Sequence, residues 1–161
     1  MGPETARRSF LRHAAGADVA VIEGNRGILD GMDAQGTHST ATLARHLEAP
    51  TVLVLPVTKT TRSAAAFVAG CQRMEPDLHL AGVILNRVGG PRHERVVREA
   101  IESETGVPVL GALPRLEGGR LLPDRHLGLV PPEERDPDRD VPGKLADLVA
   151  RFVDADALLE Q

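Results

Sequence analysis

Aromatic residues, cysteine and long apolar runs are all scarce in this sequence. It contains three Phe and neither Trp nor Tyr, so its core must be aliphatic and stacking on nucleic-acid bases is disfavoured. A formal net charge of −4 offers no basic surface for DNA or RNA. One cysteine excludes an internal disulfide, and no run reaches the roughly 18 apolar residues of a membrane span. These absences predict a soluble, cytoplasmic protein without nucleic-acid or membrane partners.

Aliphatic runs alternate with helical patterns along a chain that is long enough for one domain. The runs predict buried strands at 18–23, 51–57, 78–88 and 107–114. Helices are predicted at 4–15, 38–49, 62–74, 91–104 and 143–161, with a proline-rich loop over 116–142. Strands that alternate with helices indicate an α/β fold, with a mostly parallel sheet flanked by helices.

Four polar clusters each follow a predicted strand. They are the loop that begins at Glu23 and the residues at 58–62, 86–90 and 114–119. In sheets of this kind, ligands bind outside the carboxyl ends of the strands. We therefore expect the four clusters to converge on one edge of the sheet.

The first cluster is an acidic, glycine-rich loop, E-G-N-R-G-I-L-D-G, which begins at Glu23 and includes Asp30. A carboxylate that follows a buried strand is suited to hold Mg²⁺ beside the phosphates of a nucleotide. The glycines would let backbone amides approach an anionic ligand closely. The alternative is a solvated acidic loop whose glycines only make turns, and spacing does not separate the two.

The other clusters also permit two interpretations each. Lys59 and Arg62 stand where a strand gives way to a helix, which suits either anion binding or an ordinary helix start. Asn86 could read the edge of a purine or form a turn. Cys71, inside an alanine-rich helix, is predicted to be a small core residue rather than a nucleophile. The histidines show no metal-ligand spacing, so a zinc site is not expected.

The phosphate-binding motif G-x-x-x-x-G-K-[S/T] is absent from the sequence. The pair Gly143–Lys144 has no glycine five residues earlier and no predicted strand leading into it. The chain instead begins at a predicted helix, as though the first strand and the phosphate loop lay upstream of residue 1.

Several segments together resemble the synthetase domain of the cobyrinic acid (hydrogenobyrinic acid) a,c-diamide synthases. They include E-G-N-R-G-I-L-D-G at 23–31, L-N-R-V at 85–88 and R-H-L-G-L-V-P at 125–131, in this order. The likeness runs from about Pro3 to the last helix. Amidases that act on other tetrapyrroles, such as nickel-sirohydrochlorin, share much of the pattern.

The resemblance implies a P-loop NTPase-like fold of the dethiobiotin synthetase class, with ATP and Mg²⁺ as cofactors. It further implies that a glutaminase domain supplies ammonia. The a and c acetate carboxylates of a corrin would be activated as acyl phosphates and amidated, in cobalamin biosynthesis.

The resemblance also assigns roles to residues of this sequence. Glu23 would face Mg²⁺ and phosphate, and Asp30 would position and activate the substrate. Asn86 would read the adenine, with Arg87 beside it, and Pro114 and Arg115 would lie on the adjoining base loop. Candidates for substrate or phosphate contacts are Thr37, Ser39, Lys59 and Arg62.

In this family the phosphate loop would precede residue 1 and the glutaminase domain would follow residue 161. We therefore expect a partial synthetase domain over 1–161, truncated at its N-terminus, that binds ATP weakly, is inactive alone and self-associates through an exposed sheet edge. One alternative is another carboxylate-activating ligase, such as a dethiobiotin synthetase-like protein, which the R-H-L-G-L-V-P segment disfavours. The other is a non-catalytic scaffold or dimerisation module.

Overall fold

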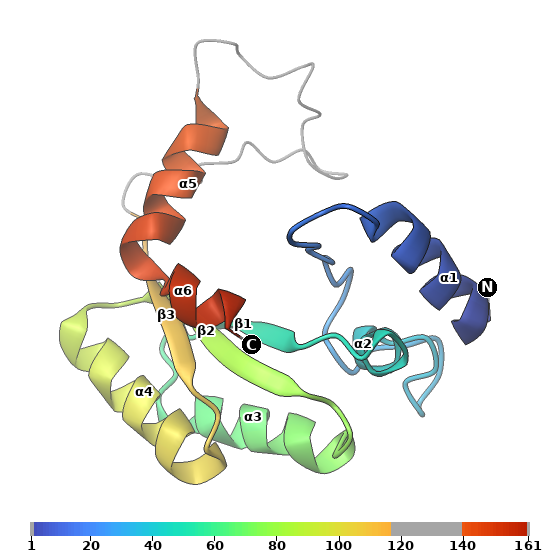
Figure 1. Ribbon diagram of the computed structural model, residues 1–161. Coiled ribbons are helices and arrows are strands. Elements are labelled where there is room, and N and C mark those ends of the chain that lie inside the picture. Colours follow the sequence, from blue (N-terminus) through green and yellow to red (C-terminus); the bar gives the residue numbers. More distant parts are fainter. Residues whose placement is uncertain (1, 117–139, 161) are drawn as a thin grey trace, which may run out of the picture.

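The computed structural model describes residues 2–116 and 140–160, and this part of the chain forms one parallel sheet with flanking helices (Figure 1). The strands are β1 (Thr51–Pro56), β2 (Leu80–Val88) and β3 (Val109–Pro114). The helices are α1 (Pro3–Ala14), α2 (Thr40–Leu47), α3 (Arg62–Met74), α4 (Pro91–Thr105), α5 (Val141–Phe152) and α6 (Ala155–Leu159). The predicted α/β fold is confirmed. No helix in the described ranges is both long and apolar enough to cross a membrane.

The sheet has the order β1-β2-β3, and all of its strands are parallel. Leu53 pairs with Val83, and Leu85 pairs with Ala112. α3 connects β1 to β2, and α4 connects β2 to β3, as parallel neighbours require. The strands predicted at 51–57, 78–88 and 107–114 are therefore confirmed to within two residues at either end.

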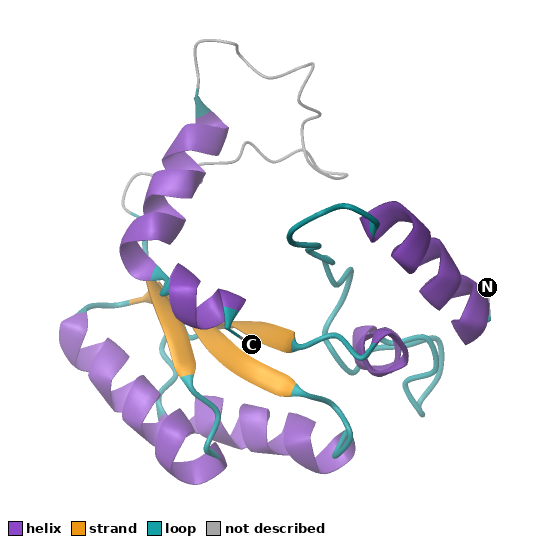
Figure 2. Ribbon diagram, viewed as in Figure 1, coloured by secondary structure: helices purple, strands orange, loops and turns teal. Residues whose placement is uncertain are grey.

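The core lies between the sheet and the helices α3 and α4, which cover one face of it (Figure 2). Leu53 and Leu55 of β1 point into this core, and so do Val83 and Leu85 of β2, because residues two apart on a strand face the same side. Its most buried members are aliphatic: Val57, Val68, Val83, Leu85, Val97 and Ile101. Cys71 is buried among them, as predicted, and burial raises the pKa of its thiol.

The opposite face of the sheet is covered at β3 and open at β1. The backbone N–H of Asp154 donates to the carbonyl of Leu110 (2.8 Å), and Val153 forms an antiparallel bridge with Gly111. These contacts bring α6 over the sheet from the side away from α3 and α4 (Figure 1). At β1, by contrast, Val54 is 54% exposed. This face therefore leaves apolar surface uncovered in the described part of the chain.

The prediction of a buried strand over residues 18–23 is wrong. These residues have no regular secondary structure and are exposed, Val21 by 90%. A strand inside a parallel sheet needs a neighbour for its backbone N–H and C=O groups. No described strand pairs with this segment, so its aliphatic side chains have no face to bury against.

The C-terminal region also differs from the prediction of one helix over 143–161. The structure has α5 and then α6, with Val153 extended between them. Helix α5 already begins at Val141, because Asp140 accepts a hydrogen bond from the backbone of Gly143 (2.8 Å) and caps the helix. Asp154 caps α6 in the same way through Ala157 (3.0 Å). Most of the loop predicted over 116–142, including the R-H-L-G-L-V-P segment, lies outside the described residues.

Candidate functional site

The carboxyl ends of the strands bring together three of the four predicted polar clusters. The backbone N–H of Val57 donates to the carbonyl of Asn86 (2.9 Å), and that of Arg115 donates to the carbonyl of Val88 (2.9 Å). Residues 57–62, 86–90 and 114–115 therefore lie along one edge of the sheet, and we call them the strand-end cluster. This part of the predicted convergence agrees with the structure.

Two cationic residues of the strand-end cluster adopt left-handed backbone conformations. Lys59 has φ 56° and Arg87 has φ 62°, and both side chains are exposed. The turn around Lys59 is closed by a hydrogen bond from the Thr60 N–H to the Val57 carbonyl (3.0 Å). Non-glycine residues avoid this region, and they persist in it only where the surroundings hold them. The cluster thus presents two positive charges on a constrained backbone, an arrangement suited to an anionic ligand.

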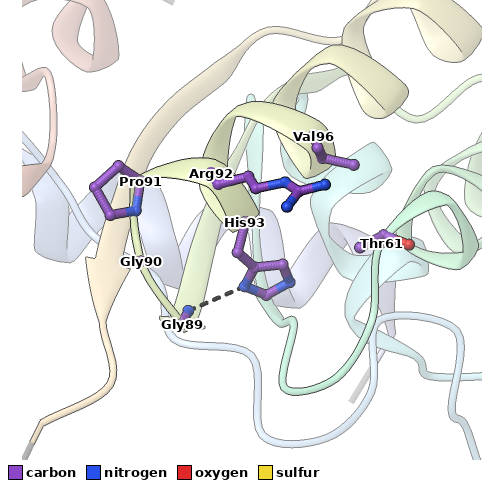
Figure 3. A pocket seen from close by; sticks show the side chains of 7 residues that line it. All are labelled: Thr61, Gly89, Gly90, Pro91, Arg92, His93 and Val96. Atoms are coloured by element: carbon purple, nitrogen blue, oxygen red, sulfur yellow. Dashed lines mark hydrogen bonds between the residues drawn. The ribbon is translucent and has the colours of Figure 1, made fainter.

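An open pocket of about 510 Å³ lies beside the strand-end cluster, at the start of α4 (Figure 3). Its lining comes from Thr61, residues 89–92, His93 and Val96. The ring of His93 accepts a hydrogen bond at Nδ1 from the Gly89 N–H (3.0 Å), and its Nε2 lies 2.6 Å from the Thr60 carbonyl oxygen. Sequence reasoning missed His93. Its position three residues after the predicted 86–90 cluster does not reveal the hydrogen bond to Thr60.

One of the residues predicted for ligand contacts at this edge has another partner in the structure. The guanidinium of Arg62 is 2.6 Å from the carboxylate of Glu104, in the last turn of α4, and 82% of the Arg62 side chain is exposed. Such exposed ion pairs add little stability and break easily. Asn86 and Pro114 are half-buried in the sheet, and Arg115 is exposed at its edge. Ligand roles for these residues remain predictions.

The acidic loop, residues 23–39, does not join the strand-end cluster. Figure 1 shows it with α1 and α2 on the side where β1 begins, away from the carboxyl ends of the strands. The expectation that all four clusters converge is therefore wrong for this one. The reason is that residues 18–23, which lead into the loop, are not paired with the sheet and cannot carry Glu23 to its carboxyl edge.

Hydrogen bonds within the acidic loop fold it back on itself. Asp33 Oδ1 accepts from the backbone N–H of Thr37 (2.9 Å) and of Gln35 (3.2 Å). Hydrogen bonds from Thr37, from both its hydroxyl and its backbone, hold the pKa of the Asp33 carboxyl below its usual value. A Cβ on Gly31 would collide with the backbone at Gly36 and Thr37. Gly31 therefore allows the chain to pack closely against residues 36–37.

Ser39, predicted as a substrate contact, has a structural role. It is buried, and its hydroxyl accepts a hydrogen bond from the Thr42 N–H (3.2 Å), which caps α2. The loop is anchored to the core nearby, since Ile28 is buried and its carbonyl accepts from the Ala41 N–H (3.0 Å). Thr37 is exposed. The substrate roles of Ser39 and Thr37 remain predictions.

The two carboxylates predicted for catalysis, Glu23 and Asp30, are both exposed. The Asp30 carboxylate lies over Gly27, where a Cβ would collide with it. Among the described residues no three His, Cys, Asp or Glu side chains group to hold a metal ion. Mg²⁺ in nucleotide sites needs only one or two carboxylates, because phosphates and water complete its shell. An exposed Glu23 fits that kind of donor set.

Comparison with known proteins gives the family. The AAA_26 family, described as an AAA domain, matches residues 5–119. The chain belongs to this family. It is P-loop NTPase-like, in agreement with the fold described above.

Curated relatives of the chain include proteins named as a,c-diamide synthases. The hydrogenobyrinate a,c-diamide synthase of Thermobifida fusca is 49% identical over 149 residues, which are 92% of this chain and 31% of the relative. The cobyrinate a,c-diamide synthase of Archaeoglobus fulgidus is 44% identical over 153 residues, 94% of this chain and 33% of the relative. The chain thus spans about a third of the length of these relatives. No solved structure matches it. The resemblance drawn from the sequence motifs is confirmed.

Proposed function

We propose that this chain is a segment of an ATP-dependent ligase that amidates the a and c acetate carboxylates of a corrin. The observation that carries the proposal is the 49% identity to the Thermobifida fusca hydrogenobyrinate a,c-diamide synthase over 92% of this chain. The chain corresponds to 31% of that relative, so other segments would complete the reaction. Among them we include a glutaminase domain, which releases ammonia from glutamine. The product belongs to cobalamin biosynthesis.

The proposed chemistry has two steps. A corrin acetate carboxylate attacks the γ-phosphorus of ATP, which forms an acyl phosphate and releases ADP. Ammonia then attacks the acyl carbon and displaces phosphate, which leaves the amide. Mg²⁺ at Glu23 would neutralise charge on the transferring phosphoryl group. Asp30 would orient the acetate carboxylate, an effect that acts through proximity.

The strand-end cluster would bind the nucleotide. Asn86 and Arg87 would contact the adenine together with Pro114 and Arg115, and Lys59 would attract the phosphates. The common edge formed by these residues supports this assignment, because ligands of parallel α/β sheets bind at that edge. The acidic loop would have to approach this edge for Glu23 to meet the same nucleotide. Residues 18–23 make no hydrogen bonds to the sheet, so no strand pairing opposes such a movement, which would have to release the anchor at Ile28 and Ala41.

A hybrid enzyme tests the proposal. The matched 149-residue segment of the Thermobifida fusca synthase is replaced by the corresponding residues of this chain, and glutamine- and ATP-dependent amidation of hydrogenobyrinate is measured. We expect an active hybrid. Glu23→Gln should lower kcat by about 10²–10³-fold, the usual effect of losing one electrostatic contact to the transition state. The matched control is Glu99→Gln, on the exposed side of α4, which should leave the rate unchanged.

A hybrid that folds and hydrolyses glutamine but does not amidate the corrin would contradict the proposal. That result would favour the alternative of a non-catalytic module. Amidation by the hybrid with Glu23→Gln at the parent rate would retain the proposed activity but remove the role of Glu23.

We also propose that the 161-residue chain alone binds Mg·ATP weakly and has no ligase activity. The support is the absence of G-x-x-x-x-G-K-[S/T] from its sequence, since this motif supplies the amides and the lysine that hold transferring phosphates. Isothermal titration calorimetry with Mg·ATP measures this directly. Binding in the micromolar range would contradict the proposal.

Self-association is a further part of the proposal. The edge of β1 that faces away from β2 has no partner strand among the described residues, and Val54 is exposed next to it. Such edges pair readily with a second chain. Light scattering should show concentration-dependent dimers or larger species, which Val54→Lys reduces. Leu159→Lys, on exposed α6, is the control. A monomer at all concentrations would contradict this part.

A further inference from the structure

His93 joins two loops that come from different strands. Its Nδ1 is 3.0 Å from the Gly89 nitrogen, and its Nε2 is 2.6 Å from the Thr60 oxygen. The Gly89 N–H is a donor, so Nδ1 must be the unprotonated nitrogen. The proton of a neutral ring then lies on Nε2 and is donated to Thr60. Both ring nitrogens are thus satisfied by one tautomer.

Each of these loops contains a cationic residue in a strained backbone conformation. Thr60 directly follows Lys59, and Gly89 lies two residues after Arg87. A non-glycine residue at positive φ costs of order 1–3 kcal/mol and needs surroundings that hold it there. His93 binds the backbone one residue after Lys59, at Thr60, and two residues after Arg87, at Gly89. Through these two hydrogen bonds it restrains the positions of Lys59 and Arg87 relative to each other.

The place of His93 in the fold suits this role. It is half-buried in the first turn of α4, and α4 packs on the sheet through the fully buried Val97 and Ile101. Gly90 has φ 140° and provides no side-chain cap for the helix. The imidazole ring in Figure 3 points from α4 toward Gly89 and the loop that contains Thr61. A helix that packs on the sheet thus presents the ring to both loops.

We propose that His93 is a positioning residue, which holds the loop of Lys59 and the loop of Asn86 and Arg87 in the register that an anionic nucleotide requires. The coupling of the loops rests on the geometry alone, and its use for a nucleotide rests on the proposed function. His93 itself need not touch the ligand. Its removal should therefore disturb both loops at once and weaken ligand binding through them.

Three substitutions separate the two hydrogen bonds. His93→Asn keeps an acceptor near Nδ1 for Gly89, and its amide is too short to reach Thr60. His93→Gln keeps a donor near Nε2 for Thr60 and loses the acceptor for Gly89. His93→Ala removes both. The control is His79→Ala, an exposed histidine just before β2.

The first measurement is nuclear magnetic resonance of the 161-residue chain without ligand. Imidazole ¹⁵N shifts should identify the Nε2–H tautomer of His93, and amide exchange should be slow at Gly89. In His93→Ala, amide signals from both loops should shift and Gly89 exchange should accelerate. His93→Asn should restore the Gly89 side, and His93→Gln the Thr60 side. An Nδ1–H tautomer, or changes confined to one loop in His93→Ala, would overturn the coupling.

The second measurement adds Mg·ATP to the same labelled chain at millimolar concentration, where weak binding is visible as shifts at Lys59 and Asn86. His93→Ala should raise the dissociation constant for Mg·ATP about tenfold, because a tenfold change corresponds to the free energy that one hydrogen bond typically contributes. His79→Ala should leave it unchanged. An unchanged constant in a folded His93→Ala chain would overturn the positioning role. No shifts in the parent chain, with the Nε2–H tautomer present, would count against the proposed nucleotide site and leave the coupling established.

Discussion

Residues 18–23 and residues 51–56 are both short aliphatic runs, but only the second forms a buried strand. The second run is β1, with Leu55 only 8% exposed, whereas in the first run Val21 is 90% exposed. β1 has β2 beside it to satisfy its backbone, and α3 and α4 beneath it to bury one face. The first run has neither in the described part of the chain. Hydrophobicity therefore identifies a potential strand, but a neighbouring strand and a covering helix are what make it one.

The largest expected effect contrasts these two environments. Leu85→Ala, at the centre of β2, should lower the free energy of unfolding by about 2–5 kcal/mol, because it leaves a cavity between the sheet and the helices α3 and α4. Val21→Ala should change it by less than about 0.5 kcal/mol. Urea unfolding followed by circular dichroism measures both. A comparable loss from Val21→Ala would mean that residues 18–23 are buried in solution and would erase the contrast.

A second comparison uses two glycines. A Cβ on Gly111 would lie 2.9 Å from the Phe152 carbonyl oxygen, so Gly111→Ala should push the end of α5 and Val153 away from β3 and cost about 1–3 kcal/mol. A Cβ on Gly70, inside α3, would have no atom within 4 Å apart from its chain neighbours and the backbone of its own helix. Gly70→Ala should therefore stabilise the chain by about 0.5–1 kcal/mol through helix propensity. Thermal melting separates the two, and a neutral Gly111→Ala would show that the contact of residues 152–154 with β3 is loose.

A smaller effect distinguishes two helix starts. Ser39 caps α2 with its side chain, whereas Thr61, at the start of α3, makes no such hydrogen bond. Ser39→Ala should cost about 1 kcal/mol, and Thr61→Ala only a few tenths. Urea unfolding midpoints provide the measurement. If Ser39→Ala were neutral, α2 and the acidic loop would unfold separately from the sheet, which would sharpen the difference between the two regions.

The smallest expected effect concerns pH and the acidic loop. The folded-state pKa of Asp33 is lowered by Thr37, so its charged form is favoured by folding. The stability that this carboxylate contributes is present above its unfolded pKa and is lost as pH falls through the lower folded pKa. The Thr37 amide signal should therefore titrate below the usual aspartate range and lose that transition in Asp33→Asn. A transition at or above the usual value would contradict the hydrogen bonds described for this loop.

The helices and strands that pack on one another were predictable because their patterns are local. The boundaries of α3 were predicted to the residue, and Cys71 was correctly placed in the core from its alanine-rich surroundings. The strand-end cluster was predictable too, since polar residues follow each strand and parallel strands end at one edge. His93 could not be found this way. Its role depends on Thr60, which is 33 residues earlier in the chain.

The sequence by itself determined the composition of the core, the parallel sheet from β1 to β3 and the family motifs at Glu23 and Asn86. Each of these can be read from a short stretch of sequence, either from the spacing of its apolar residues or from a motif of consecutive residues. The tertiary structure alone decided that residues 18–23 lie outside the sheet and that the acidic loop stands apart from the strand-end cluster. It also decided that Arg62 pairs with Glu104. The physical reason is that a strand, an ion pair or a binding site needs a partner, and the partner comes from elsewhere in the fold.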